Sequence, residues 1–256
     1  MEDSNSLSQK EYGSGLWRDI PLPARYFYAN YAHQVIDRLI SRFVSLGYSS
    51  FLEIGGCPGR WADYFYTRHH FQQCDSLDYD ANNAKIIQEN YQLLGIPGKA
   101  IVMDAESEIY RPEYEYDVVL SDGLVEHFRD FGTVFHNHVK SLKKNGLLII
   151  CVPNIKKSWF YDYFAKKDAI GYTGYRHVDK DELIKQAKDN RLEVLFCGYA
   201  GVFNIGLVHS NALSNALAKL FVVTNLILDI IFKKFRVKKE SKTFSPYIYL
   251  IAKRNE

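Results

Sequence analysis

Residues 51–61 read FLEIGGCPGRW, and this stretch decides how the chain folds. An apolar lead-in containing Glu53 is followed by glycines at positions 55, 56 and 59, and then by a run compatible with a helix. Glycines let a chain turn sharply and let a ligand approach bare backbone. The N-terminus of the following helix offers free N–H groups and a partial positive charge. The stretch therefore predicts a strand, a tight turn and a helix, as in the first βα turn of a nucleotide-binding α/β sheet.

Later segments repeat the strand pattern, and acidic residues stand where the strands end. The predicted strands cover residues 74–78, 100–103, 116–121 and 146–152. Asp78 closes the first of these about 20 residues after the glycine loop, where Rossmann-like sites carry an acid for the ribose hydroxyls. Asp104 and Asp122 follow the next two strands. Because the carboxyl ends of parallel strands share one edge of a sheet, these acids are predicted to gather where open α/β sheets bind ligands.

The loop lacks the G-x-G-x-x-G spacing of dinucleotide-binding proteins, which disfavours a nicotinamide-dependent dehydrogenase. It resembles instead the E/D-x-G-x-x-x-G loop of class I S-adenosylmethionine-dependent methyltransferases, and the resemblance covers roughly residues 47–200. The resemblance implies an α/β fold with a Rossmann-like, doubly wound, mostly parallel seven-stranded sheet. Its last strand, residues 246–253, is expected to run antiparallel next to the sixth, residues 192–197. The implied cofactor is S-adenosyl-L-methionine, which is released as S-adenosyl-L-homocysteine.

The resemblance also implies a role for each strand end. Glu53 and the loop backbone are expected to meet the methionine ammonium group, and Asp78 the ribose. Asp104 is expected to hold the adenine amino group, and Asp122 to lie near the methyl donor. The full set of expected cofactor-binding residues is Glu53, Gly55, Gly56, Cys57, Gly59, Asp78, Tyr79, Asp104, Ala105 and Asp122. Asp80 competes with Asp78 for the ribose, but it is better placed to cap the helix that follows.

Two histidines are candidates for a catalytic general base. His127 follows the fourth predicted strand, and His177 precedes Asp179-x-x-Glu182, a capping box that opens another helix. Both positions resemble those at which small-molecule methyltransferases carry histidine. An unperturbed imidazole titrates near neutrality and suits an oxygen or nitrogen nucleophile. Two alternatives stay open: His127 only caps or orients a helix, or methyl transfer needs no base. No metal site is expected.

The expected acceptor is a small molecule or a glycan, including a surface-polysaccharide or lipid-linked precursor, methylated on oxygen or nitrogen. Aromatic residues at 26–31 and 159–175 are candidates for the acceptor pocket, because their rings combine an apolar body with a polar tip. The same rings suit a lid that packs on the sheet. Bacterial surface-glycan methyltransferases are similar in layout, including a helical insert near the last strand.

Two alternative functions remain. Residues 57–61 and Ser121–Asp122 look similar to motifs of ribose 2′-O-methyltransferases acting on RNA, but that family needs a lysine just past the fifth strand, where Pro153 stands. A net charge of +2 over 256 residues also disfavours nucleic acid, because phosphate binding depends on Lys and Arg contacts. The second alternative is a methyltransferase-like partner subunit without catalysis, since a fold does not by itself imply activity.

The length of 256 residues predicts one domain, residues 25–256, after a flexible N-terminal segment, residues 1–24. Within the domain we expect an amphipathic helix at 25–43, a lid at 155–176 and a helical insert at 204–243. The N-terminus has no apolar signal core, and the four cysteines form no C-x-x-C pair. A reduced, cytoplasmic compartment is therefore expected.

The insert contains the most ambiguous helix. Residues 211–234 contain no Gly or Pro and combine a narrow polar face with a wide apolar face, followed by a basic stretch at 233–239. Its charges and amides argue against a helix that spans a membrane. One interpretation is a lid or packing helix, or the face of a homodimer. The other is an interfacial helix, residues 211–239, that contacts an anionic membrane and places the protein peripherally at its inner face.

Overall fold

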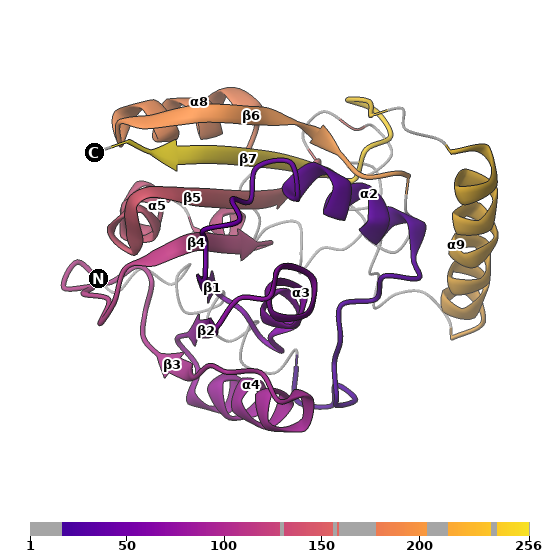
Figure 1. Ribbon diagram of the computed structural model, residues 1–256. Helices are drawn as coiled ribbons and strands as arrows, with labels where there is room; N and C mark the ends of the chain where they lie inside the picture. The colour runs from indigo at the N-terminus through magenta and orange to yellow at the C-terminus, as the bar shows by residue number, and fades with distance from the viewer. Residues whose placement is uncertain are drawn as a thin grey trace, which may run out of the picture.

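The computed structural model describes residues 17–128, 131–155, 158, 178–203, 215–236 and 240–255. These residues form a seven-stranded sheet in the order β3-β2-β1-β4-β5-β7-β6 (Figure 1). The strands are β1 (Ser50–Ile54), β2 (Gln73–Asp78), β3 (Ala100–Val102), β4 (Tyr116–Asp122), β5 (Leu142–Pro153), β6 (Leu192–Ala200) and β7 (Tyr247–Arg254). β7 runs antiparallel to both β5 and β6, whereas the other pairs are parallel. The predicted Rossmann-like fold is confirmed, and β7 lies between β5 and β6.

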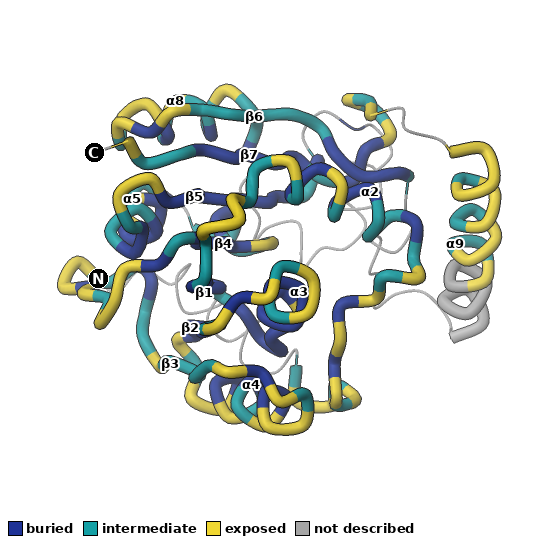
Figure 2. The backbone as a smooth tube through the Cα atoms, in the orientation of Figure 1, coloured by how far each residue is buried: buried dark blue, intermediate teal, exposed yellow. Residues whose placement is uncertain are grey.

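Helices cover both faces of the sheet. They are α2 (Tyr31–Ile40), α3 (Arg60–His69), α4 (Ala81–Leu94), the short 3₁₀ helix η1 (Val125–His127), α5 (Gly132–Lys140), α8 (Lys180–Asp189) and α9 (Asn215–Phe235). β5 alternates between the two cores: Ile149 packs with α2, α3 and α4, whereas Ile150 packs with α5 and α8. Figure 2 shows β5 and β7 as mostly buried, whereas the edge strands β3 and β6 are more exposed. The central strands are thus apolar on both faces, as parallel strands between helices must be.

Two predicted helix starts are confirmed by their caps. Asp80 precedes α4 and accepts a hydrogen bond from the Asn82 N–H at 2.7 Å. Asp179 precedes α8 and accepts from the N–H groups of Asp181 and Glu182 at 3.0 and 3.2 Å. In both places a side-chain oxygen satisfies N–H groups that the first turn of a helix leaves unpaired.

The first helix begins later than its apolar spacing predicts. α2 starts at Tyr31, behind Asn30, whose side chain accepts a hydrogen bond from the Ala32 N–H at 2.8 Å. The preceding chain is held by contacts with distant parts of the fold. Ala24 exchanges two hydrogen bonds with the Asn90 side chain, and the Tyr26 N–H donates to the Asp63 carboxylate at 2.8 Å. These long-range bonds compete with a helix before Asn30.

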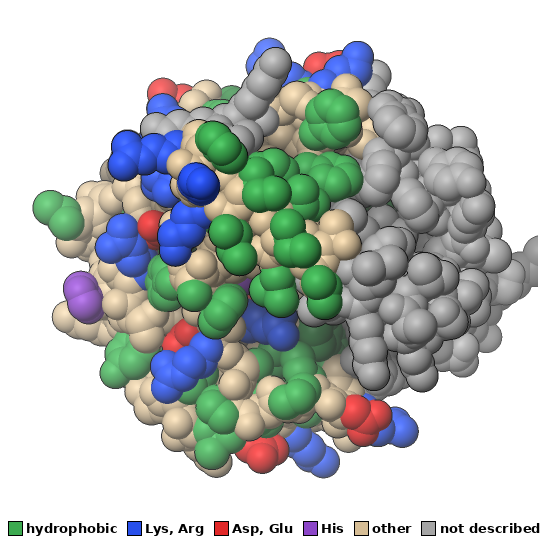
Figure 3. Space-filling view, turned by 90° about the vertical axis from the view of Figure 1, so that its right-hand side faces the viewer, with side chains coloured by type: hydrophobic (Ala, Val, Ile, Leu, Met, Phe, Trp, Pro, Cys, Tyr) green, Lys and Arg blue, Asp and Glu red, His purple; other side chains and the backbone are tan. Residues whose placement is uncertain are grey.

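Several predicted segments are described only in part. Residues 1–16 and most of the predicted lid lie outside the described residues, although Ile155 and Ser158 are described. The end of the N-terminal segment is described, and Ala24 is buried. Within the insert, α9 stands beside α2 at the edge of the molecule (Figure 1), and Figure 3 looks directly at this side.

Candidate active site

The glycine loop joins β1 to α3 and has the backbone that its sequence predicts. Gly55 and Gly59 have φ angles of 72° and 91°, which residues with a side chain rarely adopt. At Gly56 the constraint is space, since an added Cβ would lie 2.7 Å from Glu53 Cγ. The Cys57 thiol is buried in the core, and burial raises its pKa, so only the Cys57 backbone is available to a ligand.

The four predicted acids do gather at one edge of the sheet. Glu53 lies in β1, and Asp78 and Asp122 are the last residues of β2 and β4. Asp104 follows β3 after one residue. Tyr79 lies beside Asp78 and half-exposed, and burial together with the nearby carboxylates, including that of Asp104, raises its pKa to about 12. The order of the strands therefore brings residues from four separate segments to a common edge.

The ribose and adenine candidates are held by hydrogen bonds. Asp78 Oδ1 accepts from the Asp80 N–H at 3.0 Å and from Asn83 Nδ2 at 3.2 Å. The loop after β3 is fixed from α5, because Asn137 Nδ2 donates to the carbonyl oxygen of Ala105 at 2.8 Å. Asp78 is also buried, which raises its pKa. Nothing in the sequence pointed to Asn137, because it lies on α5, 32 residues after Ala105.

Glu53 and Asp122 form the electrostatic centre of this edge. β1 and β4 are neighbouring parallel strands. Burial raises the pKa of Glu53 well above its usual range, and the Asp122 carboxylate is the next largest cause. Burial also raises the pKa of Asp122. Two carboxylates so close in a poorly hydrated place favour a cation between them, because a positive charge stabilises both ionised forms.

Asp122 is held in place by residues from two other elements. Trp61 Nε1 of α3 donates to Asp122 Oδ2 at 3.0 Å, and the Cys151 thiol of β5 bonds the same carboxylate. Asp122 is exposed at the protein surface, yet burial by the surrounding protein atoms is the largest cause of its raised pKa. Trp61 is the last residue of the stretch 51–61, but the sequence alone does not predict that it bonds Asp122.

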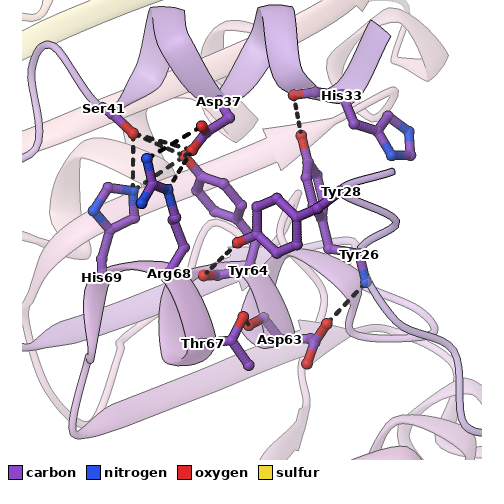
Figure 4. Close-up of polar contacts among 10 residues, drawn as sticks. All are labelled: Tyr26, Tyr28, His33, Asp37, Ser41, Asp63, Tyr64, Thr67, Arg68 and His69. Carbon is purple, nitrogen blue, oxygen red and sulfur yellow. Dashed lines mark hydrogen bonds and ion pairs between the residues drawn. The ribbon is translucent and has the colours of Figure 1, made fainter. Parts of the chain in front are cut away.

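Polar contacts fix α2 on α3 (Figure 4). Asp37 of α2 accepts hydrogen bonds from the Tyr64 hydroxyl at 3.1 Å and from Arg68 Nε at 2.9 Å. Ser41, which follows α2, donates to Asp37 at 3.1 Å. His69 Nε2 lies 3.1 Å from the Tyr64 hydroxyl oxygen. This network joins α2 and the residue that follows it to α3 by five polar side chains rather than by apolar packing alone.

The aromatic residues near the N-terminus are used mainly for packing. Tyr26 is buried, and its ring centroid lies 5.2 Å from that of Trp61. Its hydroxyl donates to the carbonyl oxygen of His33 at 3.0 Å. Tyr31 is also buried, whereas Phe27 is exposed. Among the described rings predicted for an acceptor pocket, Tyr26 contacts Trp61, which in turn bonds Asp122.

Comparison with models of known protein families decides to which family the chain belongs. A family model described as a methyltransferase domain matches residues 28–195. The chain belongs to this family. The predicted class, an S-adenosylmethionine-dependent methyltransferase, is thereby confirmed at the level of family and fold. No curated protein matches the chain.

Solved methyltransferase structures share the fold at low sequence identity. Geranyl diphosphate C-methyltransferase from Streptomyces coelicolor, solved with Mg²⁺, geranyl diphosphate and S-adenosyl-L-homocysteine, has a TM-score of 0.63 and 12% identity, over 99% of this chain and 98% of that one. A SAM-dependent methyltransferase from Archaeoglobus fulgidus has a TM-score of 0.55 and 17% identity, over 85% of this chain and 90% of that one. Such likeness shows the methyltransferase fold and leaves the acceptor open.

Of the two histidines predicted for catalysis, only His127 lies among the described residues. His127 ends η1, directly after β4, and a hydrogen bond with the Gly123 backbone holds its ring. Burial lowers the pKa of His127 to about 4, so its imidazole is neutral at pH 7. His177 lies outside the described residues. The structure thus describes one candidate base, in the segment that follows β4, and does not describe the other.

His33 lies within electrostatic range of Asp122, which sequence reasoning did not foresee. Its Nδ1 donates to the Phe27 carbonyl oxygen at 2.9 Å. Burial lowers the pKa of His33, while the carboxylates of Asp122 and Asp229 oppose that shift. The imidazole of α2 therefore lies within electrostatic range of Asp122. The sequence signal was weak, because a single histidine on an amphipathic helix usually reports nothing about catalysis.

Glu126 is the most unusual acid near this edge. It lies in η1, is buried, and its Oε2 has no hydrogen-bond partner among the described residues. Burial, followed by the Asp122 carboxylate, raises the pKa of Glu126 to about 8. Glu126 therefore holds a proton at neutral pH. The described residues contain no cluster of His, Cys, Asp and Glu that is suited to a metal ion.

Proposed function

We propose that the protein transfers the methyl group of S-adenosylmethionine to an oxygen or nitrogen atom of a small molecule or a glycan, including a surface-polysaccharide or lipid-linked precursor. The pair of Glu53 and Asp122 carries the proposal, because both carboxylates have raised pKa values. Among the described residues, no Lys or Arg forms an ion pair with either. A ligand with an ammonium and a sulfonium group supplies the missing positive charges.

Each strand end then has a distinct task. Glu53 binds the methionine ammonium group together with the loop backbone of Gly55, Gly56, Cys57 and Gly59. Asp78 accepts the ribose hydroxyls, and Asp104 with the Ala105 N–H and Tyr79 borders the adenine. Bound S-adenosylmethionine supplies a methyl group that its sulfonium activates for in-line displacement. Asp122, held by Trp61, stabilises the positive charge beside the reacting atoms.

Methylation of an O–H or N–H group releases one proton, which the protein accepts. His127 is the described candidate, because its neutral imidazole has a lone pair at pH 7, and His177 remains a candidate outside the described residues. His33 is a third, since donation by Nδ1 leaves Nε2 unprotonated in the neutral ring. A base with a pKa near 4 is fully available at neutral pH, so His127 would produce an acidic limb in the pH profile rather than one near pH 7.

The acceptor class follows from the chemistry of the site rather than from the neighbours. The Streptomyces neighbour methylates a carbon atom of geranyl diphosphate, which shows how far acceptors differ on one fold. The proposed site offers histidines and tyrosines, which suit O–H and N–H acceptors better than unactivated carbon. We place the enzyme in the cytoplasm, where the four thiols stay free, as they are in the structure.

The test is transfer of a labelled methyl group from S-adenosylmethionine to a panel of hydroxyl, amine and glycan acceptors. Methylated oxygen or nitrogen products are expected, and His127→Ala lowers kcat by about 10²–10⁴-fold if His127 is the base. His136→Ala, an exposed histidine of α5, is the matched control and leaves kcat unchanged. Transfer to RNA alone would support the ribose methyltransferase alternative. Cofactor binding without transfer to any acceptor would support the non-catalytic partner subunit.

A further inference from the structure

α9 turns its polar side toward the protein. Asp229 Oδ1 accepts hydrogen bonds from the N–H groups of Tyr31 at 2.6 Å and Ala32 at 3.3 Å. These N–H groups belong to the first turn of α2, where unpaired donors and the helix dipole favour an anion. Phe232, one turn along α9, packs against the small cluster that contains Tyr31 and Val35. Asp229 and Phe232 therefore fix the side of α9 that faces the domain.

The opposite side of α9 presents apolar side chains to solvent. Their exposed fractions run from 42% to 69%. We call this set the α9 apolar face, and its members are Val223, Leu226, Ile227, Ile230, Ile231 and Phe235. Figure 3 shows hydrophobic side chains gathered on this side of the molecule, with Lys and Arg beside them. A contiguous apolar patch of this kind marks a site of interaction, because a soluble monomer gains nothing from exposing it.

The charges of α9 are of one sign on its outward side. Asp229 is the sole acidic residue between positions 215 and 236, and α2 occupies it. Lys233, Lys234 and Arg236 are all exposed at the C-terminal end. Helical spacing puts Lys234 in the same row as Ile227 and Ile230, within the α9 apolar face. The face therefore combines apolar contact area with positive charge and lacks exposed negative charge.

We propose that the α9 apolar face docks on an anionic membrane surface, with α9 lying in the plane of the headgroups. Lysine side chains keep their charge in water while their stems lie on apolar surface, which suits a phosphate headgroup layer. A second copy of the chain fits less well, because a dry contact would bury the Lys234 charge and place like charges together. Among the described residues, none of the helices combines the length and apolar content needed to cross a bilayer.

The experiment is co-sedimentation of the full chain with vesicles, which needs no methyl transfer and so is independent of the proposed activity. The wild type sediments with vesicles of phosphatidylglycerol and phosphatidylcholine, less with phosphatidylcholine alone, and less at high salt. Combined Lys233→Gln and Lys234→Gln lowers the partition coefficient roughly 30-fold. Combined Leu226→Gln, Ile227→Gln and Ile230→Gln abolishes sedimentation while helix content by circular dichroism is retained, because glutamine is a good helix former.

A matched control separates the α9 apolar face from general surface hydrophobicity. Leu46, Leu93 and Ile109 are exposed apolar residues elsewhere on the domain, and replacing all three by glutamine leaves vesicle binding unchanged. Absence of sedimentation with anionic vesicles overturns the proposal. So does equal binding by the triple α9 variant. A dimer that sedimentation velocity detects in the wild type and not in that variant, without vesicle binding, would assign the face to a second copy instead.

Discussion

The sheet edge and the α9–α2 contact both hold carboxylates against the protein, but the sheet edge gathers acids from neighbouring strands, whereas the α9–α2 contact binds Asp229 through backbone N–H groups. Asp229 meets two backbone N–H groups of α2. Glu53 and Asp122 lie near each other, and both have raised pKa values. We infer that an acid bound to helix-terminal N–H groups is structural, whereas acids whose pKa values stay raised despite partners such as Trp61 are suited to a cationic ligand. Substitutions in the two regions should therefore have different effects: a loss of cofactor affinity at the sheet edge and a loss of stability at the α9–α2 contact.

The largest effect is expected from Glu53→Gln. Removing the carboxylate charge weakens S-adenosylmethionine and S-adenosylhomocysteine binding by roughly 30–100-fold, or about 2–3 kcal/mol, because both ligands carry the ammonium group. The free energy of unfolding does not fall, since a buried charge of raised pKa is replaced by a neutral amide of the same shape. Calorimetric titration and urea unfolding measure the two quantities. Glu89→Gln, an exposed acid of α4, is the control.

Asp229→Ala reverses that pattern. Loss of the carboxylate at the N-terminus of α2 lowers the free energy of unfolding by about 1–2 kcal/mol, as the loss of a helix-terminal acceptor does elsewhere. Cofactor affinity is unchanged. Urea unfolding beside the exposed neighbour variant Lys233→Ala checks the effect. A loss of cofactor affinity without a loss of stability would break the distinction between the two regions.

Glu126 tests what happens to a buried acid whose Oε2 has no partner among the described residues. Its folded pKa is raised from 4.5 to about 8, so its contribution to stability is complete below 4.5 and is lost as pH rises through about 8. Between these values the wild type loses up to about 1.4 kcal/mol per pH unit relative to Glu126→Gln. Thermal unfolding of both proteins from pH 5 to pH 9 measures the difference. Parallel curves would show that Glu126 is ionised at neutral pH.

The smallest effect is expected at Asp78, and it distinguishes this residue from Asp80, which stands two positions later. Asp78→Ala weakens S-adenosylhomocysteine binding by roughly fivefold, or about 1 kcal/mol, because ribose hydroxyls lose an acceptor. Asp80→Ala removes only the cap of α4, so it lowers stability by about 1 kcal/mol and leaves affinity unchanged. Titration of both variants distinguishes the roles. Equal affinity losses would mean that the ribose acid has been misassigned.

The sequence predicted the sheet edge well because its signals are local. Gly55 and Gly59 report backbone conformations, and Asp78 and Asp122 stand at strand ends that apolar runs define. Helix starts that depend on caps, such as Asp80, were equally readable. Each of these features is decided by residues within a few positions of one another, and the parallel topology then brings them together.

The remaining features were set by contacts between distant segments. The start of α2 depends on Asp63 and Asn90, which no periodicity at 25–43 reveals. The orientation of α9 depends on Asp229 meeting an N–H group 198 residues away in sequence. Apolar spacing predicted an amphipathic helix but left open whether its apolar side packs on the domain or faces outward. Trp61 and His33 were missed for the same reason, since their roles come from Asp122, a neighbour only in the folded chain.

The most direct test of the account is calorimetric titration of the wild type and Asp122→Asn with S-adenosylmethionine and S-adenosylhomocysteine, with NAD as a negative control. The asparagine oxygen still accepts from Trp61, so the variant removes charge and keeps the hydrogen bond. The account predicts that the wild type binds the first two ligands and not NAD. It also predicts that Asp122→Asn weakens S-adenosylmethionine more than S-adenosylhomocysteine, which has no sulfonium. Equal weakening of both, or no binding of either by the wild type, would contradict it.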